Sequence, residues 1–435
     1  MTVLQAAALL VGVVVGTGIF RTPPVVAANV SSETAFLGLW LLGGVISLIG
    51  ALCYAELGSA HPHVGGEYHY LRKAYGPLVG FLFGWGRMAV MQSGSIAAVA
   101  FVYGDYAAFL VPAGAFGPAL HATLVIIVLS VLQLSGTELT SRAQLVLTIA
   151  TMTLVLLVAV IGLVASPQAA TVPSPPTSGA AGLAMVFILL TYGGWSEAAY
   201  LSGEVRDPQR DMPRALLFGT VSVTLLYLLV NFGYLAALGL DGLRRSDAVA
   251  ADMVGLVVGA KAAGVVAGIV CAASLSTLNA TMLTGARSIF ALGRSFAPFA
   301  ALGRHDAGGR APHNALIVQA AITIGLIVFG AFTRAGFESM VEYTAPVYWT
   351  FLFLVGIALF LFRWREPARA IPFRVPLYPV TPLLFCATSL YLLYSSLVYT
   401  GVGALIGVGI LFTGIPIFYL GRRYIDAGAT GSLRV

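Results

Sequence analysis

The sequence predicts an all-α integral membrane protein, with one transmembrane domain over residues 1–435 that contains about twelve spanning helices. Only 9% of the residues are charged, whereas soluble globular proteins carry about 25%. Hydrophobic residues make up 59% of the chain, too large a share to be covered in water, so lipid is the expected solvent. Apolar runs of about 20 residues, the length that crosses the hydrocarbon layer, recur throughout the sequence.

Twelve apolar runs predict the individual spans when hydropathy is averaged over windows of about 19 residues. The first six lie near residues 4–27, 35–60, 77–111, 121–137, 141–166 and 180–202. The other six lie near residues 213–239, 260–293, 313–333, 338–362, 379–399 and 402–420. The polar stretches between them have the lengths of loops rather than of soluble domains.

The basic residues predict the orientation of these spans. Sixteen Lys and Arg residues fall on one side of the expected membrane, and four fall on the other, namely Arg244, Arg245, Lys261 and Arg334. Cytoplasmic loops are enriched in Lys and Arg, so the side with sixteen is the cytoplasmic one. Both termini fall on that side, which requires an even number of spans. The plasma membrane is the expected location.

Two spans contain residues that disfavour a continuous helix at mid-membrane. The first carries Gly-Thr-Gly at residues 16–18, and the sixth carries Tyr-Gly-Gly at residues 192–194. Glycine destabilises a helix interior by about 1 kcal/mol relative to alanine. Backbone groups that leave a helix are tolerated at this depth only where they line a cavity. We therefore expect both spans to be broken around one shared cavity. Glycines that merely allow close helix packing are the alternative.

The two breaks divide the chain into corresponding halves, residues 4–166 and 180–362. Each half would contain five spans and begin with a broken one, and two additional helices near residues 379–420 would follow. Inverted repeats with broken helices around a midplane site are typical of secondary transporters. A channel is less consistent with two broken helices, which favour occlusion of a substrate. A membrane enzyme is less consistent with the sequence because a metal-ligand cluster and a Gly-x-Ser-x-Gly nucleophile motif are lacking.

Four motifs follow one another in a characteristic order. The first is Gly-Thr-Gly-Ile-Phe at residues 16–20, and the second comprises Tyr-Ala-Glu-Leu-Gly at 54–58 and residues 65–76. The third runs from Tyr-Gly-Gly-Trp at 192–195 to residues 204–214, and the fourth covers residues 278–294. This ordered set resembles the amino acid–polyamine–organocation (APC) superfamily of permeases, specifically its L-type amino acid transporter-like branch. The resemblance implies twelve helices in a five-plus-five inverted-repeat (LeuT-like) fold.

The resemblance also implies that substrate lies between the two broken spans and is held largely by backbone atoms. The N–H groups of residues 17–19 would face a carboxylate, because helix N-termini favour negative charge. The carbonyls of Val14 and of residues 190–192 would face an ammonium group, and the glycines would allow close approach. The implied substrate-binding residues are Val14, Gly16, Thr17, Gly18, Ile19, Leu190, Thr191, Tyr192 and Gly193.

Such a site predicts secondary active transport of L-amino acids by alternating access, as symport or exchange, and no enzymatic activity. Leu190 stands where eukaryotic relatives commonly have Phe, so we expect neutral aliphatic or aromatic substrates. Glu197 would instead favour a cationic side chain, unless it forms an ion pair. A transporter of polyamines or other organic cations on the same fold is the alternative. No nucleic acid and no cofactor are expected. The loop 111–121 contains no cysteine, so no covalent heavy subunit is expected either.

The coupling ion is predicted to be sodium or a proton. Many bacterial relatives carry a lysine in span five where this chain has Thr151, which argues against lysine-dependent proton coupling. Sodium-coupled proteins of the same fold use carbonyl and hydroxyl oxygens, ligands that suit a hard cation. The corresponding residues here are Gly12, Val15, Ala273, Ser276 and Thr277. The alternative is that the two hydroxyls only bond to their own helix.

Several ionisable residues lie within or beside the spans. Arg87, Asp105 and Arg287 fall at membrane depth, where such residues are either functional or paired. The stretch after span two is expected to be a cytoplasmic gate whose ion pairs involve Glu56, Glu67, Arg72 and Arg214. A metal site built from His61, His63 and His69 is the less favoured alternative.

Overall fold

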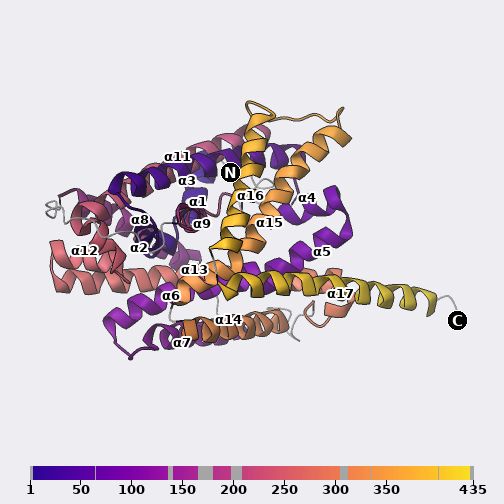
Figure 1. Ribbon diagram of the computed structural model, residues 1–435. Helices are drawn as coiled ribbons and strands as arrows, with labels where there is room; N and C mark the ends of the chain where they lie inside the picture. Colours follow the sequence, from indigo (N-terminus) through magenta and orange to yellow (C-terminus); the bar gives the residue numbers. More distant parts are fainter. Residues whose placement is uncertain are drawn as a thin grey trace.

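The computed structural model describes residues 3–63, 65–135, 141–164, 180–196, 208–303, 312–333, 335–399 and 401–431. Every regular element in these ranges is a helix (Figure 1). Ten helices in the described part of the chain are long and apolar enough to cross a membrane. The chain therefore folds as an all-helical, multi-pass membrane protein.

The ten candidate spans correspond to ten of the twelve predicted ones. Their helices are α3 (Glu33–Ala60), α5, η2 and α6 in one span (Pro77–Gly86, Arg87–Gln92 and Ser93–Leu110), α7 (Gly117–Leu134), α8 (Ser141–Val164), α11 (Pro208–Arg244), α13 (Ala260–Ser295), α14 (His313–Thr333), α15 (Gly336–Arg365), α16 (Val380–Val398) and α17 (Val402–Gly431). α11 exceeds the predicted 213–239, and a kink at Gly239, with φ of 65°, marks the predicted end.

The two predicted spans missing from these ten are the first and the sixth, the two that we expected to be broken. The first span is divided into α1 (Val3–Val14), η1 (Thr17–Phe20) and α2 (Thr22–Ala28). The sixth contains α9 (Ala181–Thr191), which is too short to cross the membrane alone. Three further short helices lie in connections between spans: α4 (Gly66–Tyr75), α12 (Val249–Val257) and η3 (Ala297–Phe299).

The helices pack in two groups. In the first group, α11 lies along α3 and α1, and α9 packs against α3 and α2. In the second group, α6 packs against α7, α13 and α14. Figure 1 shows α3 and α11 together at the top of the view and α6, α7 and α14 together at the bottom. α8 contacts both α11 and α13, and η1 contacts both α6 and α13, so the broken first span lies where the groups meet.

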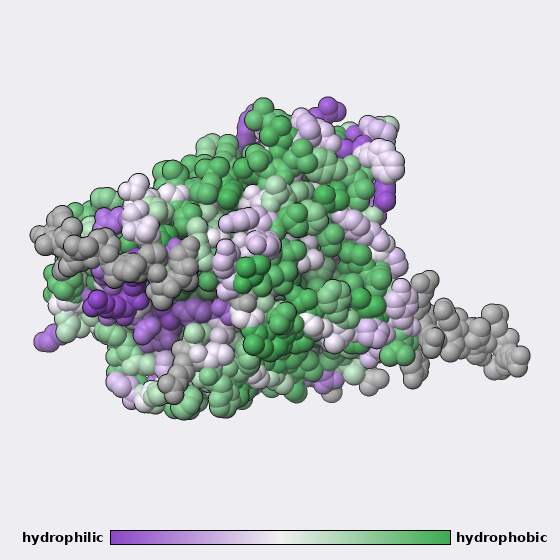
Figure 2. Space-filling model, viewed as in Figure 1, coloured by the Kyte–Doolittle hydropathy of each residue, from purple (hydrophilic) through white to green (hydrophobic). Residues whose placement is uncertain are grey.

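The outer surface of the bundle is apolar over much of its area, as Figure 2 shows for one face. On α7, the side chains of Leu120, Leu124 and Val131 are each more than half exposed. Such exposure is unfavourable in water but favourable against acyl chains. The helices therefore turn polar and small residues inwards and large apolar residues towards lipid.

Candidate functional site

The first break lies where α1 gives way to η1. The last α-helical hydrogen bond runs from the Val15 N–H to the Val11 carbonyl at 2.8 Å, and the Gly16 N–H then turns back to the Val14 carbonyl at 2.8 Å. Gly16 itself is extended, with φ of −99° and ψ of −160°. A new helical segment then begins with the 3₁₀ turn over Thr17–Phe20, and the amides of its first residues have no acceptors within the helix. These amides are available to an anionic group.

The second break begins where α9 ends at Thr191. The Gly193 N–H bonds to the Leu190 carbonyl at 3.1 Å, which closes a tight turn in place of the next helical turn. Gly194 follows with φ of 106°, a conformation that side-chain-bearing residues rarely adopt. The structure thus interrupts the sixth span at the glycines that the sequence indicated.

The two breaks lie against each other. A Cβ atom added to Gly18 would come within 3.0 Å of the Thr191 Cγ2 atom, so the backbone of the first break touches the end of α9. The hydroxyls of Thr22 and Thr191 lie 2.6 Å apart and are buried. The carbonyl end of α9 and the amide end of η1 therefore border one small, uncharged region.

Tyr227 on α11 joins the carbonyl ends of the two broken helices. Its hydroxyl lies 2.9 Å from the carbonyl oxygen of Val14 and 3.3 Å from that of Thr191, and it donates to both. The side chain is fully buried. Sequence analysis missed this residue because α11 reads as an ordinary apolar span, and nothing in its pattern marks one tyrosine among the four in spans six and seven.

Aromatic side chains close the region behind Tyr227. The Trp40 ring lies 5.8 Å from the Tyr227 ring and 6.0 Å from the Tyr192 ring, measured between centroids. The Tyr192 hydroxyl donates to the Trp40 carbonyl at 3.1 Å, so this side chain is directed towards α3. The backbone of Tyr192, rather than its phenol, is the part that remains at the break.

The predicted site residues differ in how deeply they are buried. Val14, Val15, Thr17, Ile19 and Thr191 are buried, whereas Gly16, Gly18, Leu190 and Gly193 are half-buried. Glu197, the residue that favoured cationic cargo, lies outside the described residues. The structure therefore brings the two breaks together.

The predicted sodium ligands come from α1 and α13. Ala273 and Ser276 are buried, and the Thr277 hydroxyl donates to the Ala273 carbonyl at 3.1 Å. This bond within one helix is the alternative that the sequence left open, and it leaves lone pairs for a cation on the Thr277 hydroxyl oxygen, whereas the Ala273 carbonyl also accepts the N–H of its own helix. An added Cβ at Gly12 would meet Thr148 of α8 at 3.6 Å. The residue types fit a hard cation, and the sodium site stays a prediction.

A buried ion cluster lies beyond the first break, at the start of α2. The Arg21 guanidinium contacts Asp105 of α6 at 3.0 Å, Glu338 of α15 at 3.2 Å and Asp247 at 3.5 Å. The side chains of Arg21 and Asp105 are 11% and 12% exposed, whereas that of Asp247 is 85% exposed. This Arg21 cluster, composed of these four residues, ties the broken first span to α6 and α15, and Asp105 is therefore paired.

A second ion cluster lies at the opposite end of α15 and includes Arg87 of η2, the segment that precedes α6. Glu56 of α3 accepts two hydrogen bonds from Arg363, each of 2.6 Å, and Glu67 lies 3.7 Å from Arg87. Tyr54 donates to Glu67 at 2.5 Å. Glu56 and Glu67 thus form ion pairs, as expected for this stretch, with partners on α15 and η2, and the part assigned to Arg72 and Arg214 stays a prediction. We call these five partners, Tyr54, Glu56, Glu67, Arg87 and Arg363, the Glu56 cluster.

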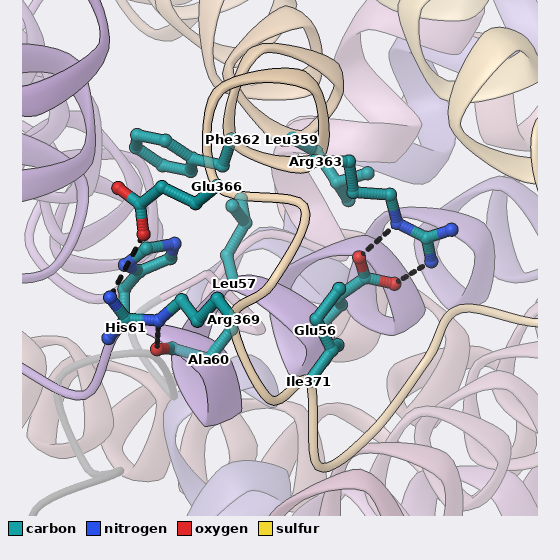
Figure 3. A pocket seen from close by; sticks show the side chains of 10 residues that line it. All are labelled: Glu56, Leu57, Ala60, His61, Leu359, Phe362, Arg363, Glu366, Arg369 and Ile371. Atoms are coloured by element: carbon teal, nitrogen blue, oxygen red, sulfur yellow. Dashed lines mark hydrogen bonds and ion pairs between the residues drawn. The ribbon is translucent and has the colours of Figure 1, made fainter.

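A small pocket opens beside Glu56, between α3, α15 and the following loop (Figure 3). His61 lines it, and its ring packs on Phe362 with centroids 4.3 Å apart. Burial, with the charges of Lys73 and Arg369, lowers the pKa of His61 to about 4, so the ring is neutral at pH 7. No group of three metal-ligating side chains occurs among the described residues.

Together these features define a class of protein, a multi-pass membrane protein with a buried backbone site between two broken helices and ion pairs at either end. Comparison with known proteins identifies the family. The family model described as amino acid permease matches residues 1–421. The chain therefore belongs to the amino acid permease family, and it is an amino acid transporter.

Individual relatives are similar over most of their length. The chain is 30% identical to the b(0,+)-type amino acid transporter 1 of Mus musculus, covering 91% of this chain and 82% of the relative. It is 29% identical to the large neutral amino acids transporter small subunit 2 of Homo sapiens, covering 96% and 79%. It is 28% identical to the serine/threonine exchanger SteT of Bacillus subtilis, covering 96% and 95%.

The bridge made by Tyr227 generates a first prediction. Tyr227→Phe keeps the ring but removes the donor that holds the carbonyls of Val14 and Thr191 at one point. The loss of one buried hydrogen bond of about 1 kcal/mol is expected to raise the KM for amino acid uptake about fivefold. Tyr234→Phe is the matched control, because the buried Tyr234 hydroxyl bonds to no residue that the structure describes. Equal KM values for the two variants would contradict the prediction.

Proposed function

We propose that this protein transports neutral L-amino acids by alternating access and binds their α-amino and α-carboxylate groups between the two breaks. The observation that carries the proposal is the contact of Gly18 with Thr191, which sets the amide end of η1 beside the carbonyl end of α9. Residues 12–20 and 188–196 contain no charged residue. A zwitterion matches these opposed backbone dipoles, and an uncharged surrounding favours a neutral side chain.

Each end of the amino acid has a specific set of backbone partners in this proposal. The carboxylate accepts hydrogen bonds from the amides of residues 17–19, as anions do at helix N-termini. The ammonium group donates to the carbonyl of Thr191, which Tyr227 holds close to that of Val14. A carbonyl oxygen has two lone pairs, so Thr191 accepts the ligand beside the tyrosine. The substrate then provides hydrogen-bond partners for backbone groups that have no partner within the broken helices.

We infer that alternating access proceeds by movement of the two helix groups against each other, as in transporters built from inverted repeats. The proposed topology has twelve spans, ten of them in the two halves 4–166 and 180–362. It places the protein in the plasma membrane with both termini in the cytoplasm. The loop 111–121 has no cysteine, so the proposal includes no disulfide-linked subunit. In this orientation the Arg21 cluster closes the outer end of the site, and the Glu56 cluster closes the inner end.

Exchange is the coupling mode that we favour, because a full-length relative is an exchanger by name. The experiment is uptake of labelled L-amino acids into liposomes that hold the purified protein. We expect an interior loaded with neutral amino acid to accelerate uptake at least tenfold over an empty interior. Amino acid analogues without the α-carboxylate, and polyamines, should not compete. Competition by polyamines alone would contradict the proposal and support the organic-cation alternative.

Sodium symport is the second candidate, and the oxygen set of Gly12, Val15, Ala273, Ser276 and Thr277 supports it. In this case uptake into empty liposomes follows an inward sodium gradient. Ser276→Ala with Thr277→Ala is then expected to raise the half-saturating sodium concentration at least tenfold. Thr284→Ala serves as the control, because the exposed Thr284 hydroxyl makes the same bond to its own helix. Uptake that does not depend on sodium would contradict this candidate.

The Arg21 cluster generates a prediction about the outer closure. Arg21→Gln leaves the carboxylates of Asp105 and Glu338 without their cation, and breaking a buried pair costs about 3 kcal/mol. Amide hydrogen exchange in α2 should therefore accelerate roughly 100-fold. Asp247→Asn is the control, since an exposed ion pair contributes about 0.5 kcal/mol at most. Slow exchange in α2 of the Arg21 variant would show that the cluster does not hold this end closed.

A further inference from the structure

The loop that joins α15 to α16, residues 366–379, lies in a basic part of the surface. Figure 1 shows this loop projecting from the upper edge of the bundle, beyond the ends of both helices. Two carboxylates form the salt bridges described in this part of the molecule, those of Glu56 and of Glu366 in the loop itself. The cations of the loop, the end of α15 and the neighbouring α4 outnumber them, and they are Arg72, Lys73, Arg363, Arg365, Arg369 and Arg374.

Specific bonds fix this loop to the ends of α3 and α4. The Val375 N–H donates to Glu56 at 2.6 Å, the same carboxylate that binds Arg363. Arg369 donates to the Ala60 carbonyl at 2.8 Å, at the end of α3. Arg365 donates to the Ala74 carbonyl of α4 at 2.7 Å. These bonds hold Arg365, the last residue of α15, and Arg369 of the loop in defined positions.

Much of the positive charge in this arrangement is not neutralised. Glu366 is shared between Lys73 at 2.7 Å and Arg369 at 3.0 Å. Arg72 and Arg374 are exposed, and neither forms a salt bridge with a residue that the structure describes. Arg365 is also exposed and uses a neutral carbonyl as its partner. The surface consequently presents several guanidinium groups that can accept an anion.

Large apolar side chains flank these arginines. Trp364 is 77% exposed and Leu377 is 79% exposed, which is unfavourable in water. Leu377 continues into the apolar face of α16, where Val380 and Leu383 are each more than half exposed. Tryptophan beside basic residues at the end of a span is typical of the membrane interface. The basic surface thus adjoins the part of the bundle that faces lipid.

We propose that Arg72, Arg365, Arg369 and Arg374, with Trp364 and Leu377, form a binding surface for the headgroup of an anionic phospholipid of the inner leaflet. The guanidinium groups bind the phosphate through charge-assisted hydrogen bonds, and guanidinium geometry suits phosphate oxygens. Trp364 and Leu377 lie against the glycerol backbone and the upper acyl chains. Continuity with the lipid-facing side of α16 identifies a lipid, rather than a soluble acidic protein, as the occupant.

The test is lipid retention by the full-length protein in mild detergent, measured by native mass spectrometry with added phosphatidylglycerol or phosphatidylcholine. We expect preferential retention of phosphatidylglycerol that weakens as salt is raised. Arg72→Gln with Arg374→Gln removes two cations without breaking a salt bridge to a described residue. Because each cation near an anionic surface contributes about 1 kcal/mol, affinity should fall about fivefold per charge removed.

Two controls make this test decisive. Arg214→Gln with Arg287→Gln removes the same charge from exposed positions on α11 and α13, and it should leave retention unchanged. Soluble glycerol phosphate should not displace the lipid, because it lacks the chains that contact Trp364 and Leu377. Equal retention of the two lipids, an equal loss in the control variant, or displacement by glycerol phosphate would overturn the proposal.

Discussion

The structure depends on one constraint, which is that a backbone N–H or carbonyl released from a helix must find a partner when it lies within a membrane. Two spans release such groups at mid-depth, after Val14 and after Thr191. Lipid offers them no hydrogen bond, so the breaks must face each other inside the bundle. The contact of Gly18 with Thr191 and the bridging hydroxyl of Tyr227 meet this requirement. The same unsatisfied groups are what a zwitterionic ligand needs.

That constraint also explains where the charges lie. A charged side chain at the breaks would compete with the ligand for the backbone groups and would be costly to bury without a partner. Two groups of paired charged residues, the Arg21 cluster and the Glu56 cluster, lie instead near Glu338 and Arg363 at the two ends of α15. Each cluster joins a helix of the first group to α15. In the proposed mechanism, closure at the ends can therefore change without altering the chemistry of the proposed site between the breaks.

The breaks could be predicted from the sequence because glycine acts locally, and residues 16–18 and 192–194 disfavour a helix whatever surrounds them. The partners of the charged residues could not be predicted in this way. Glu56 and Arg363 are 307 positions apart, and hydropathy does not record which helices become neighbours. Tyr227 escaped prediction for the same reason, since its role arises only when α11 lies beside both breaks. The motifs indicated where the two spans break, and only packing shows which residues lie beside the breaks.

The chemistry of the break also bears on coupling. Thr151, where many bacterial relatives carry a lysine, donates its hydroxyl to the Leu147 carbonyl of its own helix at 2.9 Å and adds no charge. The site then has the same net charge when it is empty and when it holds a neutral amino acid, because a zwitterion carries no net charge. Exchange of one such substrate for another moves no charge across the membrane. Sodium bound beside Ser276 would add one positive charge to the moving complex, and the membrane potential would then drive transport directly.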